Sequence, residues 1–147
     1  PFVGFWQYKE TYKNPLPTPS GKRYWHGTSF EAAQLIMARG FKKSGTARNF
    51  WKGLFGKGVY VGELGKAVHY MKMPNKSALI ECRVIAEITP VQMARGEHKD
   101  VEAIEAPAGH DTGTMKLQRG EICVYDNRKV IPVRIHIYEW RSSNVGH

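Results

Sequence analysis

Three short stretches of this 147-residue chain carry side chains whose types could do chemistry together. Residues 24–28 contain His26, residues 56–70 contain Tyr60 and Tyr70, and residues 120–125 contain Glu121. An imidazole exchanges hydrogen bonds with hydroxyl groups, phenol faces stack on cationic rings, and a carboxylate stabilises developing positive charge. We interpret the set as one ligand pocket, assembled from segments that lie far apart in the chain.

Short elements must position these residues. Residues 23–26 are typical of a strand, and Thr28 with Glu31 has the spacing of a capping box at a helix start. Apolar residues then recur at helical spacing until Gly40, which we expect to end the helix. A second helix is predicted over residues 62–73. Its expected buried stripe is Leu64, Ala67, Val68 and Met71.

Alternating apolar and polar residues predict strands over 78–88, 121–125 and 130–140, with the last two expected to form an antiparallel hairpin. Two long segments lack periodicity. Residues 42–57 are basic and contain three large aromatic residues, which favours a loop that covers a ligand. Residues 89–119 are polar and irregular. The chain is therefore expected to be an α+β domain with two helices and long loops.

The domain organisation follows from composition. Residues 1–22 are rich in aromatic residues and proline, so we expect an N-terminal extension that packs on the domain as an edge element. Residues 23–141 form the predicted domain, and residues 142–147 form a tail. The absence of a methionine at position 1 suggests an excised part of a longer protein.

Composition limits the possible partners and compartments. The net charge of +9 is compatible with a basic surface or with a polyanionic partner such as nucleic acid or a diphosphate. Cys82 and Cys123 lie in apolar, strand-like runs, which favours free thiols in a reducing, intracellular compartment. We expect no metal site, no membrane segment and a monomeric state.

The three stretches occur in a recognisable order. His26-Gly27-Thr28 ends a strand, FGKGVY over residues 55–60 precedes a helix, Tyr70 follows Tyr60 by ten residues, and Gly120-Glu121 opens a late strand. This ordered set resembles the catalytic domain of the poly(ADP-ribose) polymerase-like ADP-ribosyltransferases, with their His-Tyr-Glu triad. The similarity covers about residues 24–138. It implies an ADP-ribosyltransferase-like fold of two packed, mostly antiparallel sheets.

The resemblance also implies roles for particular residues, with nicotinamide adenine dinucleotide (NAD) as substrate. His26 would bond ribose hydroxyls, the backbone of Gly27 would bond the nicotinamide amide, and Tyr60 and Tyr70 would flank the nicotinamide ring. Glu121 would bond a ribose hydroxyl beside the reacting carbon. The catalytic residues implied are Glu121, His26 and Tyr60.

Other positions are less closely matched. The NAD-binding set implied by the resemblance comprises His26, Gly27, Thr28, Tyr60, Tyr70, Ala67 and Arg48. Ala67 stands where the family often has a serine that bonds the nicotinamide amide, so one hydrogen bond worth about 1 kcal/mol is missing. The spacing from Tyr60 to Tyr70 is one residue shorter than the family's. Arg48 is placed near the diphosphate by its region alone, since the loop has no matching motif.

The implied activity is therefore NAD-dependent ADP-ribosyl transfer, with a single unit favoured over a polymer and a protein favoured as acceptor. Two alternatives remain open at this point. The same chemistry could act on RNA or DNA, as the charge of +9 indicates. Alternatively, the change at Ala67 could mark a catalytically inactive module that binds RNA or protein.

Overall fold

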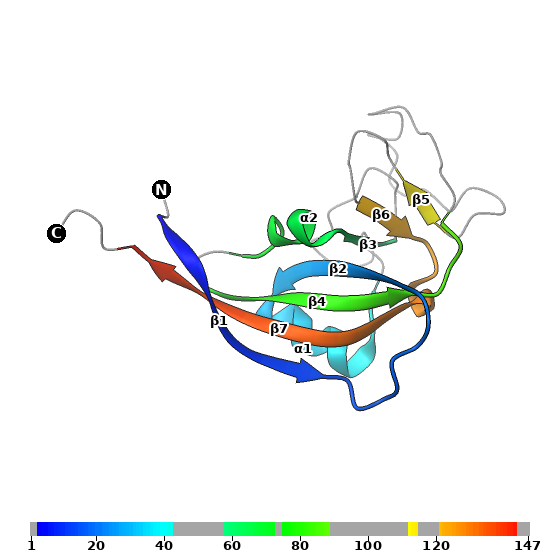
Figure 1. The fold of residues 1–147 in the computed structure, drawn as a ribbon, viewed down its shortest axis with the longest axis horizontal. Helices are drawn as coiled ribbons and strands as arrows, with labels where there is room; N and C mark the ends of the chain where they lie inside the picture. Colours follow the sequence, from blue (N-terminus) through cyan, green and yellow to red (C-terminus); the bar gives the residue numbers. More distant parts are fainter. Residues whose placement is uncertain (1–2, 43–57, 73–74, 89–111, 115–120, 144–147) are drawn as a thin grey trace.

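In the part of the chain that the structure describes, seven strands form one sheet in the order β1-β7-β4-β2-β3-β6-β5, and every neighbouring pair is antiparallel (Figure 1). The computed structural model describes residues 3–42, 58–72, 75–88, 112–114 and 121–143. The elements are β1 (Gly4–Lys13), β2 (Lys22–Ser29), α1 (Phe30–Arg39), β3 (Val59–Gly62), α2 (Leu64–Val68), β4 (Lys76–Val84), β5 (Thr112–Thr114), β6 (Glu121–Val124), the 3₁₀ turn η1 (Asn127–Lys129) and β7 (Val130–Ser142). The α+β class is confirmed.

The predicted division into two packed sheets is not found among the described residues. All their strands belong to one hydrogen-bonded sheet, but β2 and β3 share only the pair Trp25–Gly62. By contrast, β2 pairs with β4 along its whole length. The sheet is therefore weakly joined between β2 and β3, and the candidate site lies at this join.

The main core lies between the sheet and α1. Alternate residues of the central strands, including Ile80 of β4 and Ile137 of β7, are buried against Ala33 of α1. This is the side-chain alternation expected of a strand with one covered face. Burying these side chains stabilises the fold by about 1.5–3 kcal/mol each, as an upper estimate.

The boundaries of α1 differ slightly from the prediction. Ser29, not Thr28, is the N-cap, and its hydroxyl accepts a hydrogen bond from the Ala32 amide. Thr28 is still part of β2, where it pairs with Ala78, so its side chain is set by the strand. Gly40 ends the helix with φ of 80°, a conformation that favours glycine, as predicted.

The second helix is shorter than predicted. After Val68 the chain continues in turns, with the Tyr70 amide bonded to the Ala67 carbonyl. Because these bonds span three residues, the α-helical spacing no longer holds. Ala67 and Met71 are buried as expected, but Leu64 is 46% exposed and Val68 is 37% exposed, so half of the predicted stripe is wrong.

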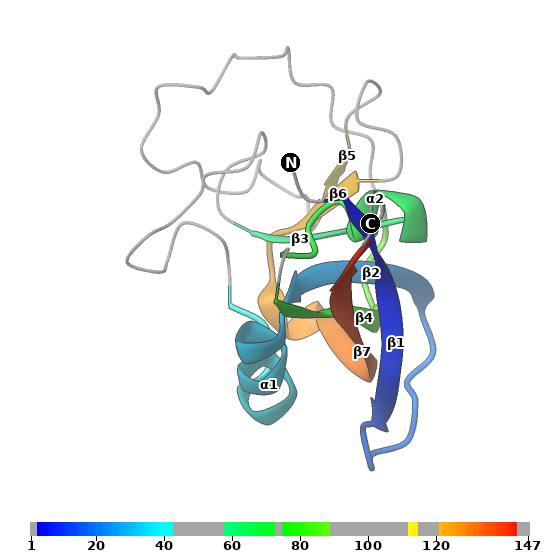
Figure 2. The same ribbon diagram turned by 90° about the vertical axis from the view of Figure 1, so that its left-hand side faces the viewer.

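The N-terminal residues form the outer strand of this same sheet. β1 pairs with β7 from Gly4 to Lys13, and the two strands run side by side at one edge (Figure 2). The predicted hairpin between the last two strands is wrong. β6 pairs with β3 and β5, whereas β7 lies between β1 and β4. The turn η1, capped by Asp126, connects β6 to β7.

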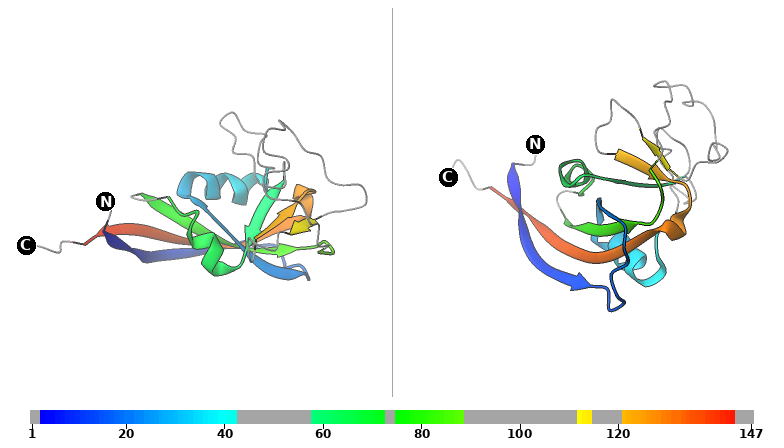
Figure 3. Two further views of the ribbon diagram at one scale, coloured as in Figure 1. Left: turned by 90° about the horizontal axis from the view of Figure 1, so that it is seen from above. Right: turned by 45° about the vertical axis from the view of Figure 1, so that its right-hand side comes forward.

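Helices α1 and α2 lie on opposite sides of the sheet. Leu79, next to Ile80 in β4, belongs to a second cluster with Ala67 and Met71 at α2. The four strands β1, β7, β4 and β2 curve, with α2 on the concave side and α1 on the convex side (Figure 3). The side of these four strands that carries α2 is called the concave face below.

Candidate functional site

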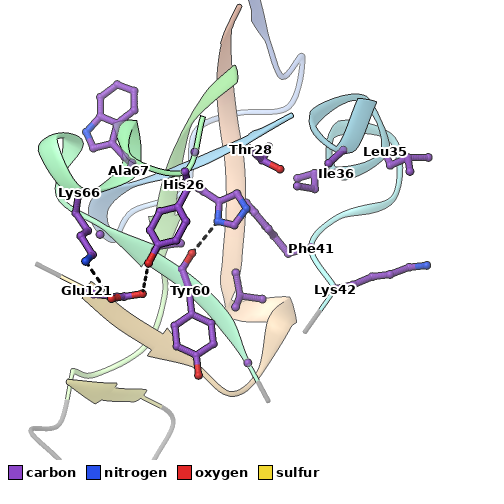
Figure 4. A pocket seen from close by; sticks show the side chains of 18 of the residues that line it. His26, Thr28, Leu35, Ile36, Phe41, Lys42, Tyr60, Lys66, Ala67 and Glu121 are labelled. Atoms are coloured by element: carbon purple, nitrogen blue, oxygen red, sulfur yellow. Dashed lines mark hydrogen bonds and ion pairs between the residues drawn. The ribbon is translucent and has the colours of Figure 1, made fainter. Parts of the chain in front are cut away.

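A cavity of about 510 Å³ lies at the join between β2 and β3 (Figure 4). Its lining comes from β2, α1, β3, α2 and the first residue of β6. The predicted site residues in this lining are His26, Gly27, Thr28, Tyr60, Ala67, Tyr70 and Glu121. The structure thus brings together all the predicted site residues that it describes, whereas Arg48 lies outside the described residues.

His26 is held by β3. Its Nδ1 lies 2.7 Å from the backbone carbonyl oxygen of Tyr60, and its ring meets that of Phe41 edge-on at 5.1 Å. A carbonyl oxygen only accepts, so Nδ1 carries the donated proton and Nε2 of the neutral ring is an acceptor. Burial lowers the pKa of His26, against an opposing effect of the Tyr60 hydrogen bond. The imidazole is therefore neutral at pH 7.

The burial of histidines predicts a pH dependence. Burial lowers the pKa of both His26 and His136 from 6.5, so the unfolded chain takes up protons that the folded protein does not. Stability is full above about pH 6.5 and falls as the pH drops, by up to about 1.4 kcal/mol per pH unit for each histidine. Urea denaturation at several pH values measures this slope. His26→Gln should remove only the part of the pH dependence that comes from His26. If the slope of stability against pH were the same in this variant, the burial of His26 would be contradicted.

Glu121 is the buried carboxylate of the site. It opens β6, is only 6% exposed, and pairs with Gly62 of β3. Its Oε1 accepts a hydrogen bond of 3.1 Å from the Tyr70 hydroxyl, and its Oε2 lies 3.7 Å from Nζ of Lys66. These two partners fix the position of the carboxylate at the cavity wall and offset the cost of burying its charge.

Tyr70 is a hydrogen-bond donor at all ordinary pH values. Burial, then the charge of Glu121 and the hydrogen bond to it, raise the pKa of Tyr70 to about 12. Lys66 also lies 5.9 Å above the Tyr70 ring. Sequence reasoning missed Lys66, because its contacts with Tyr70 and Glu121 depend on α2 meeting the start of β6.

Tyr60 and Glu121 share one face of the β3–β6 pair. Tyr60 pairs with Cys123 and Gly62 pairs with Glu121, so the two side chains are diagonal neighbours. The alternate residues, such as Val61 and Ile122, belong to the main core. In Figure 4 the Tyr60 carbonyl points to His26, while its phenol ring extends away from the imidazole.

Gly27 is the point where β2 and α2 touch. A Cβ at this position would lie 1.8 Å from the carbonyl oxygen of Ala67, so only glycine permits the contact. Among the described strands, β3 pairs with β2 only at Trp25. The edge of β2 that faces β3 therefore has no paired strand at Gly27 among the residues that the structure describes. A ligand could hydrogen-bond the backbone N–H or C=O groups at this position.

Basic side chains outnumber acidic ones in the described lining. Arg39, Lys42, Lys66 and Lys72 line the cavity with Glu121. In Figure 4 Glu121 and Lys42 lie on opposite sides of His26. Sequence reasoning missed Arg39, because it assigned anion binding to Arg48 in the loop that follows, and it did not single out Lys42 at the start of that loop. The site therefore has the carboxylate of Glu121, paired with Lys66, at one end and Lys42 at the other, which suits an elongated ligand with a cationic and an anionic part.

A scan of the chain against models of protein families finds no match, and a search of curated proteins finds none either. Within the described ranges no group of His, Cys, Asp and Glu side chains could hold a metal ion, and Cys82 and Cys123 are both buried. No described helix is long and apolar enough to cross a membrane. The chemistry of the site has to follow from its own residues and geometry.

Proposed function

We propose that the chain is an NAD-dependent ADP-ribosyltransferase with an ADP-ribosyltransferase-like fold. It would cleave the bond between nicotinamide and ribose and transfer one ADP-ribose unit to a macromolecular acceptor, with protein favoured. The observation that carries the proposal is the convergence of His26, Tyr60, Tyr70 and Glu121 on one cavity. The cavity volume of about 510 Å³ falls in the range of small-molecule sites.

The proposed binding mode uses the groups that line the cavity. Nε2 of the neutral His26 accepts from a ribose hydroxyl, and the open β2 edge at Gly27 bonds the nicotinamide amide. Tyr60 and Tyr70 contact the cationic ring, an interaction worth about 1 kcal/mol or more when the ring is desolvated. Among the described residues, Arg39 and Lys42 are the candidates for binding the diphosphate, in place of Arg48.

In the proposed reaction the glycosidic C–N bond breaks and its electron pair leaves with nicotinamide, which becomes neutral. Positive charge develops on the ribose ring, and an acceptor nucleophile then bonds the same carbon and releases a proton. Glu121 acts by its fixed negative charge beside this ribose. A carboxylate has about four acceptor positions, so Glu121 can bond a ribose hydroxyl while it keeps Tyr70 and Lys66.

The experiment is titration with NAD by calorimetry, together with chromatography of the products. We expect binding, and slow release of nicotinamide even without acceptor. Tyr60→Ala should weaken binding by about fivefold or more, because a ring contact worth about 1 kcal/mol is lost. Tyr12→Ala is the control, since Tyr12 is a half-exposed tyrosine on β1, outside the cavity.

Three outcomes are distinguishable. Binding with nicotinamide release that depends on Tyr60 supports the proposal. Binding without release would instead identify a non-catalytic module, the alternative that Ala67 suggested. No binding of NAD or nicotinamide at millimolar concentration would overturn both the substrate and the assignment of the cavity.

A further inference from the structure

The concave face carries an unusual density of aromatic side chains. The register places Trp6 opposite Trp140 and Tyr8 opposite Tyr138 across β1 and β7. Both pairs meet edge to face, with ring centroids 5.1 Å and 5.8 Å apart. Directly opposed residues of two paired strands project to the same side of a sheet. Tyr138 and Trp6 pack against the α2 cluster, which fixes that side as the concave face.

A β-bulge brings Tyr8 onto this face. The register shifts between Tyr8 and Glu10, so even-numbered residues of β1 point to one side of the sheet before the bulge and to the other side after it. Tyr8 opposes Tyr138, whereas Tyr12 opposes the core residue Ile135 on the convex side. Without the extra residue, Tyr8 and Tyr12 would share a side, because they are four positions apart.

Some of these aromatic residues line a second cavity, which shares Trp25 with the lining of the candidate site. It measures about 340 Å³ and is lined by Trp6, Trp25 and Tyr138, by His136, and by the exposed apolar side of α2 at Leu64 and Val68. Trp25 and His136 lie 5.6 Å apart. Nε2 of His136 is buried and has no hydrogen-bond partner in the described part of the chain. The aromatic lining of the cavity suits a planar ring.

Basic side chains lie beside the aromatic ones. Arg23 of β2 is exposed and lies 5.9 Å from the Trp25 ring centroid. The register puts Arg83 opposite Arg23 and Arg134 opposite Glu81. Glu81 is buried and is shared by Arg134 at 2.6 Å and Arg23 at 3.8 Å. Arg83 lies two residues beyond Glu81 in β4, on the same side of the sheet, so this part of the face has three arginines and one carboxylate and is positively charged.

We propose that the concave face binds single-stranded nucleic acid. Tyr8 is exposed, and Trp6, Trp25 and Tyr138 on the same face are partly buried. Aromatic rings on a sheet next to arginines can stack unpaired bases and contact their phosphates. A duplex offers no free base faces, and an apolar peptide gains nothing from the positive charge of the arginines. The net charge of +9 for the whole chain favours the same kind of partner.

The test measures binding of fluorescently labelled single-stranded RNA and DNA oligonucleotides, and of the matching duplex, by anisotropy without NAD. We expect the single strands to bind more tightly than the duplex and to quench tryptophan fluorescence. Tyr8→Ala should weaken binding about tenfold, since stacking on one aromatic ring is lost. Arg23→Ala should lower the slope of log affinity against log salt concentration by about one unit. The variant should stay folded, because Glu81 keeps Arg134 as its partner.

Two control variants match these changes on the opposite side of β1 and β7. Tyr12 is 51% exposed against 55% for Tyr8, so Tyr12→Ala removes an equivalent ring from the convex side. Arg141 opposes Phe5 and contacts Gln7, so Arg141→Ala removes an equivalent charge. Both controls should bind as the wild type does.

Several outcomes would overturn the proposal. They are no binding at low salt, equal affinity for the duplex, or equal losses in Tyr8→Ala and Tyr12→Ala. Capture of a peptide at this face with no affinity for single strands would do the same. Because NAD is absent from the experiment, failure here leaves the proposed transferase activity standing, and loss of that activity would leave this proposal intact.

Discussion

Replacing Glu121 with glutamine is expected to slow nicotinamide release by about 10²–10³-fold, while the affinity for NAD changes little. Glutamine keeps the size and the acceptor oxygen of the side chain but removes its negative charge. The charge matters only when the ribose becomes positive, so the loss falls on the transition state more than on the bound substrate. The effect should therefore appear in kcat rather than in the dissociation constant.

The measurement is single-turnover nicotinamide release with saturating NAD, together with calorimetry for binding. Glu63→Gln is the matched control, because Glu63 precedes α2, is exposed and is absent from the cavity lining. Its rate should equal that of the wild type. Equal rates for Glu121→Gln and the wild type would contradict the proposed role of the carboxylate, whatever the affinity for NAD.

A spectroscopic readout separates this role from simple unfolding. The charge of Glu121 is the second cause, after burial, of the raised pKa of Tyr70, which lies at about 12. In Glu121→Gln that contribution disappears, so the Tyr70 hydroxyl should ionise at lower pH in an ultraviolet titration. A folded variant with an unchanged tyrosine titration would mean that Glu121 and Tyr70 are not coupled as the 3.1 Å hydrogen bond indicates.

Local sequence signals were enough to predict parts of this fold. The alternation around Ile80 and around Ile137 predicted β4 and β7, although the predicted ends differ by a few residues. Gly40 predicted the end of α1, because the positive φ at this position is a conformation that glycine adopts readily. The motifs around His26, Tyr60 and Glu121 predicted a shared pocket, and the structure places the three residues around one cavity.

The order of the strands had no comparable signal. Nothing local distinguishes a β6–β7 hairpin from two strands in distant parts of the sheet, since sheet order depends on long-range packing. The bulge in β1 also has no local sequence signal. A single extra residue moves Tyr8 to the concave face, and no glycine marks the position. Lys66 and Arg39 were missed because their roles depend on which elements meet at the cavity.

Gly27→Ala is expected to destabilise the protein by about 3 kcal/mol and to lower the melting temperature by about 10 °C. A Cβ at residue 27 would lie 1.8 Å from the carbonyl oxygen of Ala67 and 2.8 Å from its carbonyl carbon. These atoms are backbone, so no side chain can rotate aside. Either β2 or α2 has to move. Because Ala67, Lys66 and Tyr70 line the cavity, movement of α2 also displaces the partners of Glu121.

Gly65→Ala is the control, because a Cβ on this residue of α2 has nothing within 4 Å. That change should be neutral or stabilise the protein by up to about 1 kcal/mol, since alanine favours a helix over glycine. Urea denaturation monitored by circular dichroism compares the two variants, and NAD titration follows the site. If Gly27→Ala were as stable as Gly65→Ala, the close contact of β2 with α2 would be refuted. The glycine at position 27 would then need another explanation, in ligand binding alone.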